Sequence, residues 1–152
     1  MGQTAIISIR TADPSDAPEI ARLNRLFNNH DEPAENYRGR LSDPLRVDTP
    51  LLTELEGGTV GFANLRLAPA VFYPEPYAEL TELFVEEAFR RRGVGRALLA
   101  YAEGLALAAG ATMLIIQTDF YNHAAQQLYR SAGYCHRDIA LCKSFNPAAP
   151  AD

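Results

Sequence analysis

The chain has 152 residues, of which 47% are hydrophobic and 22% charged, a composition typical of one globular domain that can bury a continuous core. Its 19 acidic and 14 basic side chains give a formal net charge of -5, which disfavours a general nucleic-acid-binding protein and mildly favours cationic ligands. No apolar run approaches the ~20 residues that span a bilayer and no signal peptide is evident, so we expect a cytoplasmic protein without a membrane partner.

The first part of the chain predicts a strand followed by a helix. Residues 6–10 are apolar and β-branched, which is typical of a short strand. Pro14 and Asp16 then open an amphipathic segment in which apolar residues recur at helical spacing as far as Phe27. Residues 28–48 are polar and irregular, with room for one further short helix.

A hairpin and a further strand follow. Residues 51–56 and 60–67 predict two antiparallel strands, and Gly57-Gly58 between them is a strong signal for a tight turn. Residues 77–85 predict the next strand, after a loop rich in Pro and Tyr. The remaining elements are a long helix, a strand buried on both faces, a short helix and a last strand: residues 91–109, 112–118, 122–133 and 139–145.

This order of elements predicts an α/β (α+β) fold with a mixed, mostly antiparallel central sheet flanked by helices on both faces. We expect one domain over residues 1–146. Residues 147–152 are small and Pro-containing, which predicts a flexible C-terminal tail. Cys135 and Cys142 lack CxxC spacing and no Cys/His cluster has the form of a metal site, so we expect reduced structural thiols and no metal.

Residues 90–96, RRRGVGR, carry a candidate anion site, because they follow a predicted strand and lead directly into a helix. The first helical turn has amide N–H groups without internal partners, and the helix dipole favours anions there. Glycines at 93 and 95 would let a phosphate approach the backbone. Four arginines surround them with positive charge: Arg90, Arg91, Arg92 and Arg96. The pattern predicts a pyrophosphate site; a tight turn with surface arginines is the alternative interpretation.

Other phosphate-binding motifs do not fit this segment. A Walker A loop needs GxxxxGK[ST], and no glycine here is followed by lysine. A Rossmann fingerprint needs GxGxxG, and Leu98 occupies the third glycine position.

A second pattern follows at residues 118–134, TDFYNHAAQQLYRSAGY. Together with R-x-x-G-x-G at residues 90–95, it closely resembles the GNAT superfamily of N-acetyltransferases. The resemblance is specific over residues 78–134 and looser over residues 7–67. It implies the GNAT fold, with the sheet splayed at the acetyl-CoA site, acyltransferase activity with acetyl-CoA as cosubstrate, and a homodimer.

The resemblance also implies cofactor-binding residues. The backbone of Phe84 and Val85 would bind the pantetheine arm, and a main-chain N–H of Leu83 or Phe84 would polarise the thioester carbonyl. Asn122 matches a position that contacts the cofactor arm, although asparagine there is also a good helix N-cap. The pyrophosphate would be held by main-chain N–H groups of Arg91, Arg92, Gly93, Val94, Gly95 and Arg96.

The catalytic acid and base are implied less completely. Tyr129 matches the family's general acid, which protonates the departing thiolate; a half-buried tyrosine facing solvent is the alternative. The base is open between Glu79, which matches the base of histone-type members, Glu82, which sits where small-molecule members contact substrate, and ordered water. Strand alternation places residues 79 and 82 on opposite faces unless a bulge between them resets the register.

We expect direct attack by a primary amine within a ternary complex, because neither cysteine lies near the expected thioester. We expect the acceptor to be a small molecule. The glutamates that crowd the strand 77–85 predict an acidic funnel for a cationic amine, unless they are solvated surface. The alternatives are a non-catalytic acyl-CoA-binding module and a protein acetyltransferase acting on N-termini or lysines. The acidic surroundings disfavour a nucleic-acid contact through RRRGVGR.

Overall fold

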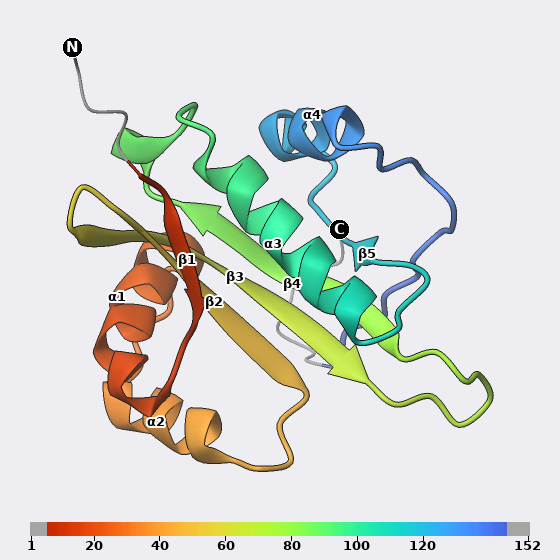
Figure 1. Cartoon of the computed structure of the whole chain (residues 1–152), viewed down its shortest axis with the longest axis horizontal. Helices are drawn as coiled ribbons and strands as arrows, with labels where there is room; N and C mark the ends of the chain where they lie inside the picture. Colours follow the sequence, from red (N-terminus) through yellow and green to blue (C-terminus); the bar gives the residue numbers. More distant parts are fainter. Residues whose placement is uncertain (1–5, 146–152) are drawn as a thin grey trace.

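The computed structural model describes residues 6–145, so the predicted tail at 147–152 lies outside the described residues. Within that range the strands form one sheet in the order β1-β2-β3-β4-β5, with the first four antiparallel to their neighbours and β5 parallel to β4 (Figure 1). The elements in chain order are β1 (Ser8–Thr11), a 3-10 turn (Pro14–Asp16), α1 (Ala17–Asn28), α2 (Ala34–Ser42), β2 (Asp48–Leu55), β3 (Gly58–Ala68), β4 (Tyr77–Val85), a second 3-10 turn (Glu87–Phe89), α3 (Val94–Ala108), β5 (Ile115–Ile116) and α4 (His123–Ser131). The predicted mixed, mostly antiparallel sheet is confirmed.

Alternation along the strands gives the sheet two apolar faces, each covered by helices (Figure 1). Leu51 on β2 belongs to the core cluster under α3, together with Leu98 and Leu99 of that helix. Its neighbour Leu52 points the other way, into the cluster that contains Leu23 of α1. The prediction of helices on both faces is therefore confirmed.

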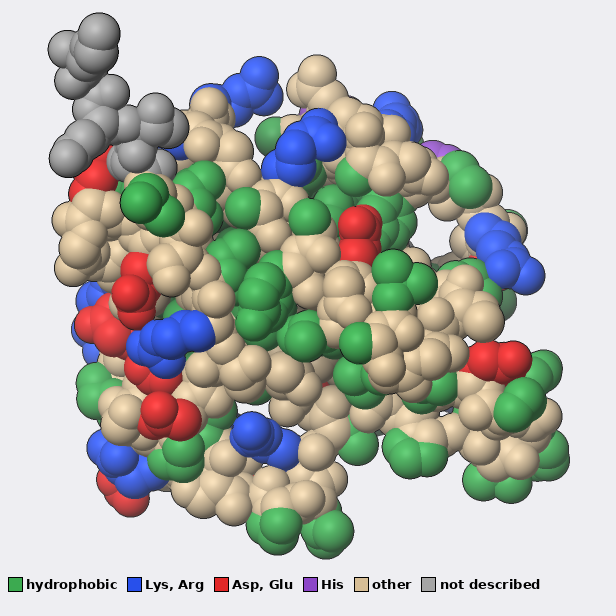
Figure 2. All heavy atoms as spheres, in the orientation of Figure 1, with side chains coloured by type: hydrophobic (Ala, Val, Ile, Leu, Met, Phe, Trp, Pro, Cys, Tyr) green, Lys and Arg blue, Asp and Glu red, His purple; other side chains and the backbone are tan. Residues whose placement is uncertain are grey.

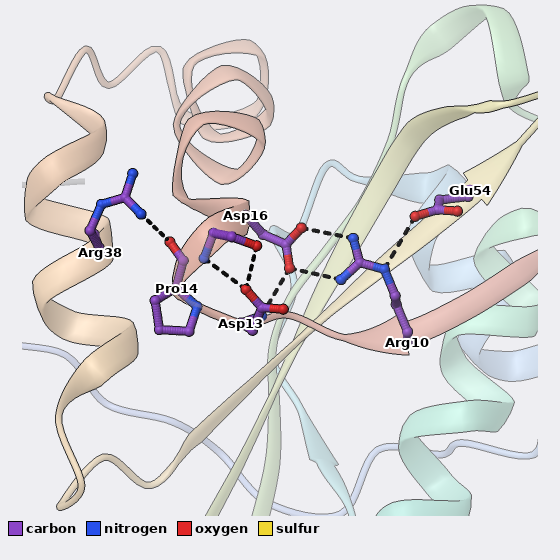
Figure 3. A network of polar contacts seen from close by, with 7 residues as sticks. Arg10, Asp13, Pro14, Asp16, Arg38 and Glu54 are labelled. Atoms are coloured by element: carbon purple, nitrogen blue, oxygen red, sulfur yellow. Dashed lines mark hydrogen bonds and ion pairs between the residues drawn. The ribbon is translucent and has the colours of Figure 1, made fainter.

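The start of α1 is fixed to the sheet by a network of charged side chains (Figure 3). Asp13 and Asp16 form a capping box, and Arg10 on β1 donates two hydrogen bonds of 2.7 Å to the Asp16 carboxylate. Arg10 also donates to Glu54 on β2 at 3.2 Å, and Arg38 of α2 donates to the Pro14 carbonyl at 3.0 Å. Hydrogen bonds from the Arg10 guanidinium hold the pKa of Asp16 below its usual value. The network joins two strands and two helices at one corner of the fold.

The hairpin turn lies one residue earlier than predicted. Leu55 pairs with Gly58, so the two turn residues are Glu56 and Gly57, at φ 56° and 83°. Positive φ at both positions is the signature of the two-residue hairpin turn that matches strand twist. Glu56 adopts this conformation while its carboxylate forms an ion pair with Arg92.

Two predictions for the last third of the chain need correction. The strand predicted over 112–118 is reduced to Ile115–Ile116 and is half-buried, and the strand predicted over 139–145 is wrong, because these residues have no regular structure. Ile139, Leu141 and Phe145 are exposed. Alternating apolar residues form a strand only where a ladder partner exists, and the two-residue β5 offers almost no edge on which to pair.

Candidate active site

A β-bulge in the middle of β4 decides where its glutamates point. Asn64 pairs with Glu82 and Leu65 pairs with Leu80, so Thr81 has no residue of its own on β3. Asn64 Nδ2 donates to Thr81 Oγ1 at 2.8 Å, which fastens the bulge. An extra residue in one strand shifts the alternation of side chains by one position.

Because of this bulge, the two glutamates lie on the same face of the sheet. Glu79 is opposite Arg66 and Glu82 is opposite Asn64, and these partners are two residues apart on β3. Phe84 shares that face, since it belongs to the apolar cluster under α1. The structure thus brings together Glu79 and Glu82, which simple alternation would have separated.

The other edge of β4 is open beyond its first residues. β5 pairs with Glu79 and Leu80 and, within the described chain, its pairing with β4 ends there. The amide of Glu86 donates to the Val60 carbonyl at 2.9 Å, and in an antiparallel ladder the paired groups alternate from this point. The backbone groups of Phe84 therefore face β3, whereas those of Leu83 and Val85 face the open edge. Of the two residues predicted to offer a main-chain N–H, Leu83 has the suitable direction.

The amides of the first turn of α3 lie beside this edge, and no helical hydrogen bond within residues 6–145 engages them. The first bond of the helical ladder runs from the Ala97 N–H to the Gly93 carbonyl at 3.0 Å, so the amides of residues 94–96 precede the ladder. Gly93 has φ 86° and Arg91 has φ 62°, which turn the chain sharply into the helix. A backbone that exposes consecutive amides at a helix N-terminus is suited to bind an anion.

Gly95 allows the close packing around this helix start. A Cβ there would lie 3.4 Å from Leu128 Cδ2 of α4 and 3.8 Å from Leu83 Cδ2 of β4. A Cβ alone would make ordinary van der Waals contacts at these distances, whereas a larger side chain would crowd α4 and β4.

The four arginines do not all converge on the helix start. Arg90 Nε donates to the Val85 carbonyl at 2.9 Å, on the open edge of β4, and Arg92 forms an ion pair with Glu56 of the hairpin. Arg96 Nη2 donates to Ser131 Oγ of α4 at 2.6 Å. All four are exposed, and Figure 2 shows basic side chains along the edge at which α3 begins and α4 lies.

On α4, the structure gives the two predicted residues different environments. Asn122 is the helix N-cap, with its Oδ1 accepting the Ala125 amide at 3.1 Å. Tyr129 is half-buried against the cluster under α3 that contains Val85, and burial raises the pKa of its hydroxyl. Tyr134 packs beside it and donates to Glu103 at 2.9 Å.

Tyr129 and the glutamates thus approach β4 from opposite sides. Tyr129 lies on the α3 side, whereas Glu82 lies on the α1 side. Burial raises the pKa of Glu82, an effect opposed by a hydrogen bond from Asn28 and by the charge of Arg66. A raised carboxylate pKa makes Glu82 a better proton acceptor at neutral pH.

The polar side chains around Glu82 include residues that sequence reasoning missed. Arg66 Nε donates to Asp48 at 2.8 Å, and the two carry opposite charges next to the glutamates. Burial and the charge of Glu79 raise the pKa of Tyr77. Asn64 and Arg66 are ordinary strand residues in sequence, and only the register with β4 reveals that they face the site.

Residues 6–145 hold neither a metal-binding cluster of side chains nor a membrane-spanning helix. Over this range no group of three or more His, Cys, Asp or Glu side chains is arranged to hold a metal ion. Nor does this part of the chain contain a helix with the length and apolarity to cross a bilayer.

The profile of the Acetyltransferase (GNAT) family matches residues 15–134. The chain belongs to the GNAT acetyltransferase family. It is 31% identical over 135 residues to the Bacillus subtilis (strain 168) protein named Uncharacterized N-acetyltransferase YhfO, an alignment that covers 84% of this chain and 89% of the relative. It is also 30% identical to the aminoglycoside N(6')-acetyltransferase type 1 of Stenotrophomonas maltophilia, over 84% and 85% of the two chains.

Solved structures agree with the fold of this GNAT chain. The aminoglycoside N-acetyltransferase AAC(6')-Iy in complex with CoA superposes with a TM-score of 0.79, over 95% of this chain and 97% of that one, at 17% identity. GNAT acetyltransferases use acetyl-CoA. The chain is therefore a GNAT N-acetyltransferase, and the predicted family, fold and acyltransferase class are confirmed.

Proposed function

We propose that this GNAT protein transfers the acetyl group of acetyl-CoA to a primary amine of a small cationic molecule, by direct attack in a ternary complex. One observation carries this function: the open edge of β4 lies between unpaired amides at the start of α3 and a pair of carboxylates on the α1 face. The match over residues 15–134 supports one catalytic domain over residues 1–146.

The residues present fit acetyl-CoA. The main-chain amides of 94–96, with the exposed Arg91 and Arg96 beside them, would hold the pyrophosphate. The outward-facing backbone groups of Leu83 and Val85 would bind the pantetheine arm along the open edge. We propose that Asn122, whose Oδ1 caps α4, contacts that arm through Nδ2. When bound, acetyl-CoA supplies an activated acetyl thioester.

The chain's own groups then have distinct tasks. Glu82 takes a proton from the acceptor ammonium, directly or through ordered water, and its raised pKa suits this exchange. The Leu83 N–H polarises the carbonyl that is attacked. Tyr129 stays protonated at neutral pH, because burial raises its pKa, and it protonates the departing sulfur. Glu79, on the same face, is the alternative base.

Local charge supports a cationic acceptor. This face carries three carboxylates, those of Asp48, Glu79 and Glu82, beside the guanidinium of Arg66. A positively charged amine is therefore attracted to it electrostatically. The relative from Stenotrophomonas maltophilia is named as an aminoglycoside acetyltransferase, which is consistent with a polycationic substrate.

The test is CoA-thiol release with acetyl-CoA and a panel of amines that contains an aminoglycoside, a polyamine and a neutral primary amine. We expect turnover of the cationic amines and intersecting initial-rate patterns, as a ternary complex requires. Thermal stabilisation by acetyl-CoA without turnover of any amine, peptides included, would support a non-catalytic module instead. Faster turnover of the neutral amine would disprove the acidic funnel.

A further inference from the structure

The C-terminal end of α1 is fastened to the face of β4 that carries the glutamates. The Phe27 ring lies 5.2 Å from the Phe84 ring and 5.8 Å from the Phe62 ring, measured between centroids. Asn28 follows Phe27 and ends the helix, and Glu82 is two residues from Phe84 on the same face. This packing places the Asn28 amide near the Glu82 carboxylate, where hydrogen bonding from the amide lowers the pKa of that carboxylate.

Asn28 is itself held by a chain of hydrogen bonds. Its Nδ2 donates to Asn24 Oδ1 at 2.7 Å, one turn earlier on α1. Asn24 Nδ2 in turn donates to the hydroxyl oxygen of Tyr37 on α2 at 2.7 Å. An amide nitrogen has two N–H groups, so Asn28 can serve Asn24 and Glu82 together. The chain thus runs from α2 through α1 to β4.

The backbone of Glu82 is fixed from the opposite side. Asn64 pairs with Glu82 across the ladder, and its Nδ2 bond to Thr81 Oγ1 ties down the bulge that precedes it. The bulge therefore determines on which face of the sheet the Glu82 side chain lies. The contact with α1 then determines the conformation of that side chain.

We propose that Asn28 is a positioning residue that holds the Glu82 carboxylate toward the acceptor amine, and that Asn24 and Tyr37 hold Asn28 in place. The inference rests on the proposed function, since Asn28 acts only through Glu82 and touches no reacting atom. The same chain of hydrogen bonds also connects α2 to Glu82, the proposed proton acceptor.

Loss of the Asn28 amide should change the pKa of Glu82 in one definite direction. A hydrogen bond to the ionised carboxylate favours that form, so loss of the Asn28 amide raises the pKa of Glu82. The other charged groups that act on Glu82 are Arg66 of β3, which lowers its pKa, and Asp48 of β2, which raises it. Glu79 and Tyr77 act on Arg66. These groups stay in place when Asn28 is changed.

The decisive experiment measures kcat against pH for Asn28→Ala with the fastest amine of the panel. We expect kcat near neutral pH to fall by about tenfold, the loss typical of one hydrogen bond to a charged group, and the acid limb to move to higher pH. The KM for acetyl-CoA should not change. Asn36→Ala is the matched control, since Asn36 also donates to a glutamate, Glu32, at 3.0 Å, and it should leave both quantities unchanged.

Three further variants separate positioning from folding and from direct substrate contact. Asn28→Asp keeps the shape of the side chain but adds a negative charge, so the acid limb of the kcat profile should move further to higher pH. Tyr37→Phe removes the hydroxyl that accepts the last hydrogen bond of the chain, and it should move the acid limb to higher pH by a smaller amount. Adding Asn28→Ala to Glu82→Gln should cost no additional activity. An acid limb that stays in place in Asn28→Asp and Tyr37→Phe, or a rise in amine KM alone, would overturn the positioning role. Absence of wild-type turnover would instead overturn the proposed function.

Discussion

The two faces of β4 show how one strand supports both halves of the active site. On the α3 side, Leu80, Leu83 and Val85 pack into one continuous apolar cluster with the helix that begins at the anion site. On the α1 side, Glu79 and Glu82 emerge among polar partners from strands and a helix that lie far apart in the chain. In the proposed function, the first face supports the strand edge that binds the cofactor, and the second face receives the acceptor.

The bulge at Thr81 lets both faces exist on one strand. Without it, Glu79 and Leu83 would share a face, and Glu82 would point into the apolar cluster under α3. Burial of a carboxylate there without a partner would cost several kcal/mol. The single extra residue therefore separates the apolar face of β4 from the face that carries the two glutamates.

The largest effect should come from the cofactor side. Gly95→Val places a branched side chain where even a Cβ would lie 3.4 Å from Leu128, so α4 must move and the amides at the start of α3 are obstructed. We expect kcat/KM for acetyl-CoA to fall by about 100-fold, as misplaced binding geometry can cause. Isothermal titration with acetyl-CoA should show the same loss. Gly104→Val is the control, because a Cβ there meets nothing within 4 Å; equal affinity of both variants would refute the role of Gly95.

The next effect should come from the acceptor side. Glu82→Gln removes the proposed proton acceptor while keeping the shape of the side chain, and we expect kcat to fall by about 100-fold, within the range for general-base catalysis. The affinity for acetyl-CoA should stay within about twofold, because the proposed cofactor contacts are main-chain groups at the open edge of β4 and at the start of α3, and the Glu82 side chain is not among them. Glu79→Gln is the comparison variant. If Glu79→Gln loses more activity than Glu82→Gln across the pH profile, the base is Glu79.

The same comparison explains what could be read from the sequence. The proposed cofactor half of the site is formed by residues close together in the chain, because strand, turn, Gly93 and helix follow one another. β4 was therefore predicted with its correct bounds. The N-cap role, which the sequence offered for Asn122 beside a contact with the cofactor arm, could be read for the same reason, since a cap is a contact over three residues. Only the direction of the Leu83 amide required the ladder.

The acceptor half depends on pairings that no local pattern encodes. Arg66 faces Glu79, and Asn28 reaches Glu82, because of register and of the packing of α1. The bulge could be anticipated as a possibility between residues 79 and 82, but only the register of β3 with β4 shows that it is present and that Thr81 is the extra residue. The missing strand at 139–145 has a related cause, since its apolar alternation specifies a strand without specifying an edge to receive it.

A moderate effect on stability is expected at the corner that holds α1 against the sheet. Asp16→Asn leaves the Arg10 fork without a carboxylate and weakens the capping box, so we expect a loss of about 2 kcal/mol in the free energy of unfolding. The measurement is urea unfolding at pH 7, with Asp138→Asn as the exposed control.

The pH dependence of this effect follows from the sign of the shift. Because the folded pKa of Asp16 lies below its unfolded value, its contribution is fully present above the unfolded pKa of about 4. It is lost as the pH falls through the folded pKa. The stability difference between wild type and Asp16→Asn should therefore shrink in acid, and a difference that stays constant down to pH 2 would contradict the assignment.

The smallest effect concerns the hairpin, at the end of the sheet where β2 turns into β3. Glu56 holds φ 56°, a conformation that costs about 1 kcal/mol in most residues and that asparagine adopts more readily. Glu56→Asn creates an Asn-Gly turn but removes an exposed ion pair with Arg92 worth about 0.5 kcal/mol. We expect a net gain of about 0.5 kcal/mol, seen as a rise in Tm of about 2 °C. Glu35→Asn, at an exposed helical site with its own arginine partner, should lower Tm slightly, and a fall in Tm for Glu56→Asn would show that the ion pair outweighs the strain.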